Sequence, residues 1–206
     1  MKQISLFFLC ICFTILNCKQ TSSDLDNILE EELLPIEIKN TVIDLSELKL
    51  NQNTGIWYYK QFPFSGYAIK HYLNQQLAEK TGFHQGKRQG FSRKWFSNGV
   101  LRYESYYQKN RLEGDYKSWW PNGQQFEELQ YKNGLQEGYE KKWYATGQLA
   151  KQRKLLKGQE SGMQKAWLSN GDLYVNYEAK NGRTFGLQRS NACYLLKNEK
   201  LVLYNE

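Results

Sequence analysis

The sequence predicts an all-β fold, an elongated single-layer antiparallel meander of 24-residue β-hairpin repeats. Glycines recur at that spacing through the 206-residue chain, and a fixed period of this length is typical of repeat proteins. The composition agrees, because 15 Tyr, 10 Phe and 6 Trp stand against only 3 Pro, and aromatic residues favour strands. Turn-forming Asn-Gly or Thr-Gly pairs end nine residues after four of these glycines. The repeating glycines are Gly66, Gly90, Gly114, Gly138, Gly162 and Gly186.

The first 17 residues are predicted to be a lipoprotein signal peptide. The apolar stretch 4–16 would span about 20 Å as a helix, which is shorter than a hydrocarbon core of roughly 30 Å. An apolar stretch of this length after a basic start is typical of a signal-peptide core. The residues up to Cys18 resemble a bacterial lipoprotein box, which implies cleavage before Cys18 and acylation of its sulfur, for example with palmitate. An ordinary secretory signal with an incidental cysteine is the alternative.

This N-terminal segment predicts a lipid-anchored protein of the bacterial cell envelope. Acyl chains contribute about 0.8 kcal/mol per buried methylene, so a multiply acylated cysteine anchors a protein firmly. Lys19 is not an acidic retention residue, and this favours the outer membrane. Two of the four cysteines leave with the signal peptide and Cys18 carries lipid, so Cys193 has no disulfide partner within the chain.

A charge boundary divides the remaining chain. Residues 18–56 form a predicted acidic arm, with a net charge of −5 over 19–56, whereas residues 57–206 carry +11. Apolar residues between Leu25 and Leu33 have helical spacing, and Pro35 would end that helix. The arm either spaces the body from the membrane or folds back onto the basic body.

Each repeat of the array 57–206 is predicted to form one β-hairpin. The units start near 66, 90, 114, 138 and 162, with a partial unit at 186. Pro121 argues against a two-residue type I′ loop, because it would occupy the closing pair of the ladder without an N–H to donate. A type I turn with a G1 bulge fits instead. This three-residue loop predicts four cross-strand pairs: Trp95 with Leu101, Trp119 with Gln125, Trp143 with Leu149, and Trp167 with Leu173.

Two-residue periodicity sorts the side chains onto two faces. We expect the Trp and Leu columns to share one face with Phe83, Tyr107, Tyr131 and Leu155. Both faces keep polar residues, so neither suits the interior of a sandwich, and each repeat is expected to stack only on its neighbours. The other face is expected to carry Tyr72, Phe96, Trp120, Tyr144 and Leu168, with Lys70, Lys94 and Lys142 nearby.

The repeat pattern G-x4-W-x2-N-G-x-L-x8-N-G-x3-G resembles the bacterial MORN-variant repeat. Over about residues 50–190, the array looks like the family of YwqK-type antitoxins. The resemblance implies a non-enzymatic protein. MORN repeats are associated with protein or lipid binding and with scaffolding, and the antitoxin family implies neutralisation of a toxin by binding it.

No residue pattern indicates catalysis, so neither an enzyme nor a cofactor is expected. His71 occupies the Trp column, where it replaces a packing aromatic residue, and His84 lies thirteen residues further on. No cysteine or carboxylate cluster accompanies them at metal-ligand spacing, so no metal site is predicted. Glu127 and Glu128 are neighbours on one predicted strand, point to opposite faces and cannot share a site. Cys193 is expected to be a small buried apolar residue.

The predicted function is non-catalytic binding of a protein partner, as a scaffold or as an antitoxin-like or immunity-like factor. Trp and Tyr dominate binding energy in protein interfaces, and the basic body favours an acidic partner. Export disfavours nucleic acid as a partner. The candidate binding residues are Trp95, Trp119, Trp120, Trp143, Tyr144 and Trp167, with the cations Arg93, Lys117, Lys141 and Lys165.

Two other roles remain open for these cations, each of which stands two residues before a tryptophan. Interleaved with aromatic rings, they suit binding of an anionic envelope component, either a lipid headgroup or a glycan. They also suit a structural role, in which their stems pack over the Trp rings.

Overall fold

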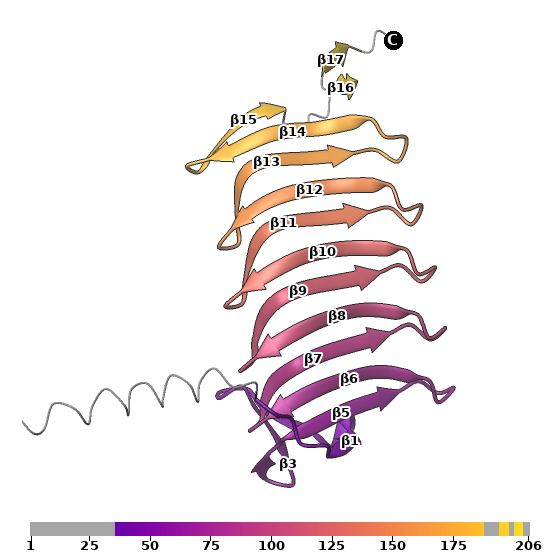
Figure 1. Cartoon of the computed structure of the whole chain (residues 1–206), viewed down its shortest axis with the longest axis vertical. Coiled ribbons are helices and arrows are strands. Elements are labelled where there is room, and N and C mark those ends of the chain that lie inside the picture. The colour runs from indigo at the N-terminus through magenta and orange to yellow at the C-terminus, as the bar shows by residue number, and fades with distance from the viewer. Residues whose placement is uncertain (1–35, 188–193, 198–199, 204–206) are drawn as a thin grey trace, which may run out of the picture. The chain divides into compact units, whose positions relative to one another are not determined.

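A computed structural model of the protein describes residues 36–187, 194–197 and 200–203, which are almost entirely β. No helix among these residues has the length and apolar character needed to cross a membrane. All the described strands lie in the compact unit Ile38–Glu206 (Figure 1). Its main strands are β5 (Gly66–His71), β6 (Leu77–His84), β7 (Lys87–Trp95), β8 (Leu101–Gln108), β9 (Arg111–Trp119), β10 (Gln125–Lys132), β11 (Leu135–Trp143), β12 (Leu149–Leu156), β13 (Gln159–Trp167) and β14 (Leu173–Lys180).

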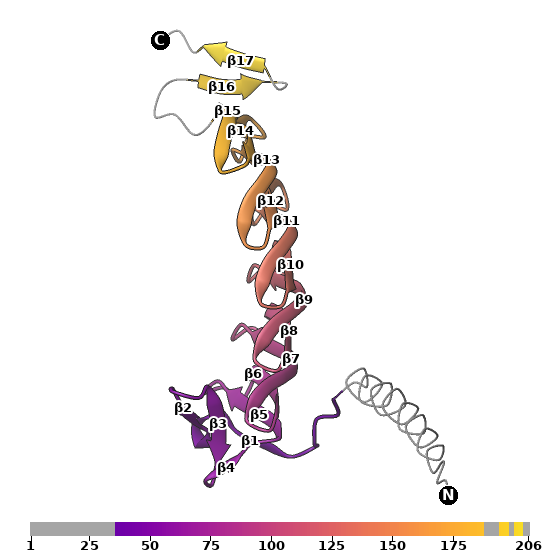
Figure 2. The ribbon, with the colours of Figure 1, turned by 90° about the vertical axis from the view of Figure 1, so that its left-hand side faces the viewer.

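Strands β5 to β14 form the predicted antiparallel meander of consecutive hairpins, within a 14-stranded sheet. Figure 1 shows one hairpin following the next along the sheet, and Figure 2, turned by 90°, shows β7 to β13 in a single layer. Each repeat of 24 residues contributes two strands and two turns. Each sequence repeat therefore adds the same number of strands to the sheet.

The turns that follow β5, β7, β9, β11 and β13, which we call the wide turns, are the predicted three-residue loops. After β7, the Gly99 N–H donates to the Phe96 carbonyl at 2.9 Å, and the Phe96 N–H donates to the Val100 carbonyl at 2.8 Å. Gly99 has a φ of +84°, as a type I turn with a G1 bulge requires. The predicted pairing of Trp95 with Leu101 is confirmed, as are the three equivalent pairs.

A β-bulge beside each wide turn contradicts part of the predicted face assignment. In β8 the pairing moves from Trp95–Leu101 to Lys94–Tyr103, so Arg102 is an extra residue. One extra residue reverses the side-chain alternation along the rest of the strand. The second strand of each repeat therefore turns its later side chains away from the Trp column. The prediction that these side chains share the Trp column's face is wrong for Phe83, Tyr107, Tyr131 and Leu155.

The turns that follow β6, β8, β10, β12 and β14, which we call the narrow turns, are two-residue type I′ loops. Both loop residues have positive φ, for example 49° at Lys109 and 72° at Asn110. This conformation defines the type I′ turn and matches the twist of the adjoining strands. In Figure 2 the edge formed by the narrow turns faces the viewer.

Hydrogen bonds join successive repeats at both edges of the sheet. At the narrow turns, the Asn133 N–H donates to Glu113 Oε2 of the preceding repeat at 2.7 Å. At the wide turns, the Asn98 side-chain amide donates to the Pro121 carbonyl of the next repeat at 2.9 Å. Neighbouring hairpins are thus fixed to one another outside the strand ladder as well as within it.

An N-terminal cap, residues 42–65, covers the first hairpin. Residues 42–56 of the cap belong to the stretch that the sequence analysis assigns to the acidic arm 18–56. Strand β1 pairs with β5 in parallel, and a three-stranded sheet follows. The cap comprises β1 (Val42–Asp44), the 3-10 helix η1 (Leu45–Glu47), β2 (Lys49–Asn51), β3 (Ile56–Tyr59) and β4 (Phe62–Pro63).

The buried apolar cluster of the protein lies between this cap and the first hairpin. It consists of Leu48, Phe64, Ala68 and Phe83. Close approach of the cap requires Gly86, which has a φ of +73° and whose added Cβ would lie 2.8 Å from the Trp57 carbonyl oxygen. A residue without a side chain is therefore needed at this narrow turn.

Beyond β14 the regular hairpins end. Strand β15 (Arg183–Leu187) pairs with β14, and β16 (Tyr194–Lys197) pairs with β17 (Lys200–Leu203). Several predictions lie outside the described residues, namely the signal peptide 1–17, lipidation of Cys18, the helix between Leu25 and Leu33, and the burial of Cys193.

Candidate binding face

One face of the sheet, which we call the Trp face, carries a row in which tryptophan alternates with leucine or glutamine. The tryptophan side chains are half-buried. The cap lies against the other face, where it packs on Ala68 and Phe83, and no described strand or helix packs over the Trp row. This row comprises Trp95, Leu101, Trp119, Gln125, Trp143, Leu149, Trp167 and Leu173.

A second row of the Trp face contains cations, with carboxylates between some of them. The four predicted cations lie in it: Arg93, Lys117, Lys141 and Lys165. The register places Glu104 between Arg93 and Lys117, and Glu128 between Lys117 and Lys141. Arg93 forms an ion pair with Glu104, and Lys141 Nζ lies 3.2 Å from Glu128 Oε1. These two carboxylates compensate part of the positive charge of the four cations, and the neutral Gln152 lies between Lys141 and Lys165.

A third row of the Trp face was missed by the sequence analysis. It contains Phe91, Tyr139 and Met163, whose side chains are 47%, 49% and 40% exposed. Each follows a glycine of the 24-residue column, and this shared position is the signal that could have revealed the row. The row adds accessible apolar surface to the Trp face, on the far side of the cation row from the half-buried tryptophans.

The candidate residues Trp120 and Tyr144 lie on the opposite face, as the sequence predicts, and they join repeats. Trp120 Nε1 donates to the Trp143 carbonyl at 3.0 Å, and the Tyr144 hydroxyl donates to the Trp167 carbonyl at 2.8 Å. The Tyr72 hydroxyl makes the equivalent bond in the first repeat. The candidate binding residues therefore fall into two groups. Trp120 and Tyr144 donate hydrogen bonds to the next repeat, and the other candidates lie on the Trp face.

Replacing Trp120 with phenylalanine is expected to lower the free energy of unfolding by about 1 kcal/mol, because the indole N–H bond to the next repeat is lost. Phe96 fills the same column without a donor, so the repeat accommodates the smaller ring. Urea unfolding followed by circular dichroism measures the change. A variant as stable as the parent chain would show that the hydrogen bond contributes nothing.

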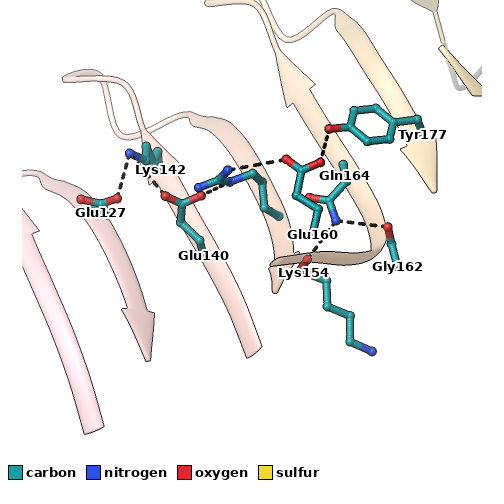
Figure 3. A network of polar contacts seen from close by, with 9 residues as sticks. Glu127, Glu140, Lys142, Lys154, Glu160, Gly162, Gln164 and Tyr177 are labelled. Carbon is teal, nitrogen blue, oxygen red and sulfur yellow. Dashed lines mark hydrogen bonds and ion pairs between the residues drawn. The ribbon is translucent and has the colours of Figure 1, made fainter. Parts of the chain in front are cut away.

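A network of charged side chains around the buried Glu140 crosses the opposite face from β10 to β14 (Figure 3). The Glu140 side chain is 2% exposed, forms an ion pair with Arg153 and lies 3.4 Å from Lys142 Nζ. Lys142 also reaches Glu127 at 2.8 Å, and Arg153 reaches Glu160 at 3.5 Å. The network links neighbouring strands through alternating charges.

The protonation states of this network follow from its contacts. Burial alone would raise the pKa of Glu140, but the hydrogen bond and charge of Arg153, together with the charge of Lys142, lower it below its ordinary value. Burial and a 2.7 Å hydrogen bond to Glu160 raise the pKa of Tyr177 to about 12. At neutral pH Glu140 is therefore ionised and Tyr177 is neutral, as their hydrogen bonds require.

The chemistry-bearing residues singled out in the sequence lie apart. His71 pairs with Leu77 in the Trp column, and His84 pairs with Lys87 beside a narrow turn. Glu127 and Glu128 pair with successive residues of β9, which places them on opposite faces, as predicted. Within the described part of the chain, no group of three or more His, Cys, Asp or Glu residues is suited to hold a metal ion.

The chain is thus a single-layer β-hairpin repeat protein. Its Trp face, which no described strand or helix covers, is an extended and partly apolar surface. No protein-family model matches the chain, and no curated protein sequence matches it. Its function is therefore inferred from its surfaces and from the repeat pattern.

Proposed function

We propose that the protein is a non-catalytic binding protein of the bacterial cell envelope, anchored by lipid on Cys18, which presents its Trp face to a protein partner. The observation that carries the proposal is the Trp row, which no described strand or helix covers, together with the exposed Phe91, Tyr139 and Met163 on the same face. Aromatic and methionine side chains are enriched in protein interfaces, and Trp and Tyr are frequent hot spots.

The size and charge of the Trp face support a protein partner. At about 4.8 Å per strand, ten strands extend the face over nearly 50 Å. A standard interface takes roughly 800 Å² from each partner, which a face of this length can supply. Arg93 and Lys141 form ion pairs with Glu104 and Glu128, which compensate part of the positive charge that would attract an anionic lipid or glycan. The resemblance to MORN-variant arrays also supports a scaffold or immunity-like role.

Photo-crosslinking in the native envelope tests the proposal. A photoreactive residue at Phe91 or at Met163 is expected to give one discrete protein adduct, because both side chains are exposed on the Trp face. A second substitution, Tyr139→Asp, is expected to reduce that adduct at least tenfold by placing a charge in the interface. Mass spectrometry of the adduct measures both results.

A photoreactive residue at Tyr103 serves as the matched control, because its register with Lys94 places it on the opposite face. An equal adduct from position 103, or an adduct unchanged by Tyr139→Asp, contradicts the proposal. Adducts with lipid or glycan alone would favour the anionic envelope component as the ligand.

A further inference from the structure

The two edges of the sheet differ sharply in charge. The wide turns, 72–76, 96–100, 120–124, 144–148 and 168–172, hold no cation and one carboxylate, Asp172. The narrow turns, 84–87, 108–111, 132–135, 156–159 and 180–183, hold cations and no carboxylate. This narrow-turn edge faces the viewer in Figure 2. Its cations are Lys87, Lys109, Arg111, Lys132, Lys157, Lys180 and Arg183.

These edge cations are exposed and form no ion pair within the described part of the chain. The ion pairs among the described residues all use cations of the two sheet faces. Glu113 and Glu137 lie in the strands that follow two of the narrow turns, but their carboxylates accept backbone N–H groups of Asn133 and Lys157 at 2.7 and 2.9 Å. Both carboxylates keep their negative charge, but the seven cations of the narrow turns outnumber them, so the edge keeps a net positive charge.

A hollow of about 420 Å³ opens on this edge at its most basic point. Three cations, two side-chain amides and one carboxylate line it, and the cations and amides donate hydrogen bonds to carboxylate oxygens. Guanidinium and ammonium groups form the stronger, charge-assisted bonds. The lining residues are Lys87, Gln108, Lys109, Arg111, Glu113 and Asn133.

We propose that the narrow-turn edge binds an extended acidic segment of a polypeptide, with one carboxylate in the hollow and others along the line of cations. The inference rests on the proposed function for the class of partner, a protein, but it uses a different surface from the Trp face. Adjacent narrow turns are two strands apart, or about 9.6 Å, so an extended chain meets successive cations within a few residues. The net positive charge of the narrow-turn edge also accelerates the protein's encounter with an acidic partner.

Two exposed leucines favour a polypeptide over other polyanions. Leu135 and Leu156 are 49% and 52% exposed and stand among the cations of this edge. Side chains of a polypeptide can cover them, whereas a polyphosphate chain offers them no apolar contact. Two leucines also provide much less apolar area than the whole helix face with which interfacial segments enter a bilayer.

Binding of a fluorescein-labelled poly-glutamate peptide to the full chain tests the inference by fluorescence anisotropy. The edge variant combines Lys87→Gln, Lys109→Gln and Arg111→Gln. The repeat already carries glutamine at these columns, as Gln85 and Gln159, so the fold tolerates it. The control variant removes the same charge from exposed positions of the N-terminal region, by Lys39→Gln, Lys49→Gln and Lys60→Gln.

The expected result is binding that weakens with salt, about tenfold weaker in the edge variant and unchanged in the control variant. Equal losses in the two variants would show a non-specific effect of net charge and would overturn the inference. Absence of peptide binding would also overturn it, as would preferential binding to inorganic polyphosphate or to phosphatidylglycerol vesicles. Crosslinking from Phe91 is unaffected by the edge variant, so the two proposals fail separately.

Discussion

Replacement of Phe83 by alanine is expected to lower the free energy of unfolding by about 3 to 5 kcal/mol. Phe83 is 1% exposed, and its ring centroid lies 5.9 Å from those of both Trp57 and Phe64. The substitution removes the ring that joins the cap to the first hairpin and leaves a cavity between them. Because the remaining sheet is a single layer, other described elements cannot close over the gap.

Urea unfolding and limited proteolysis measure this effect together. We expect the Phe83→Ala chain to be cleaved within residues 48–62 under conditions in which the parent chain resists. Phe91→Ala is the matched control, because Phe91 is 47% exposed on the Trp face and its loss is expected to cost less than about 1 kcal/mol. If the two variants were equally stable, the cap cluster would not be the main apolar core.

Substitution of Glu140 by glutamine is expected to lower the free energy of unfolding by about 2 kcal/mol at neutral pH. The carboxylate is buried and pairs with both Arg153 and Lys142. Glutamine keeps the volume but removes the charge, so the two cations lose their shared partner. The cost is smaller than for a fully buried pair, because the Arg153 and Lys142 side chains remain 24% and 33% exposed.

The same substitution is expected to change the acid stability profile. The folded-state pKa of Glu140 lies below its ordinary value, so its contribution to stability is complete above the unfolded pKa of about 4.3 and is lost as the pH falls through the folded pKa. The parent chain should therefore lose more stability on acidification than Glu140→Gln. Urea unfolding between neutral pH and pH 3 measures the difference.

Glu178→Gln is the control for charge alone, because Glu178 is exposed on the sheet. We expect it to alter neither the neutral stability nor the acid profile appreciably. A Glu140→Gln chain whose deficit is the same at every pH would contradict the assignment, since that deficit would not depend on the ionised carboxylate.

The alternation of faces shows where sequence reasoning reached its limit. The loop between Trp95 and Leu101 was predictable, because Pro121 and the Asn-Gly pairs leave one turn geometry that fits all repeats. The bulge at Arg102 was not, because a single extra residue has no fixed side-chain signature. It therefore reversed the predicted face of Tyr107, although the strand itself was correctly placed.

The compensation of charge on the Trp face also could not be predicted from the sequence. The column of Arg93, Lys117 and Lys141 is visible in the sequence, and it suggested a cationic surface. Its partial compensation by Glu104 and Glu128 depends on which strands are adjacent and in which register. A second line of cations lies at the narrow turns, whose own residues include no carboxylate.

The amino-acid sequence alone determined the repeat length, the hairpin unit, the wide-turn type and the Trp row, because each depends on local spacing and turn chemistry. The tertiary structure decided the cap, the bulged faces, the ion pairs across strands and the charge difference between the two edges. Those features depend on contacts between residues about 10 to 55 positions apart, such as Asn110 with Gly55, and such contacts exist only once the register of the strands is fixed.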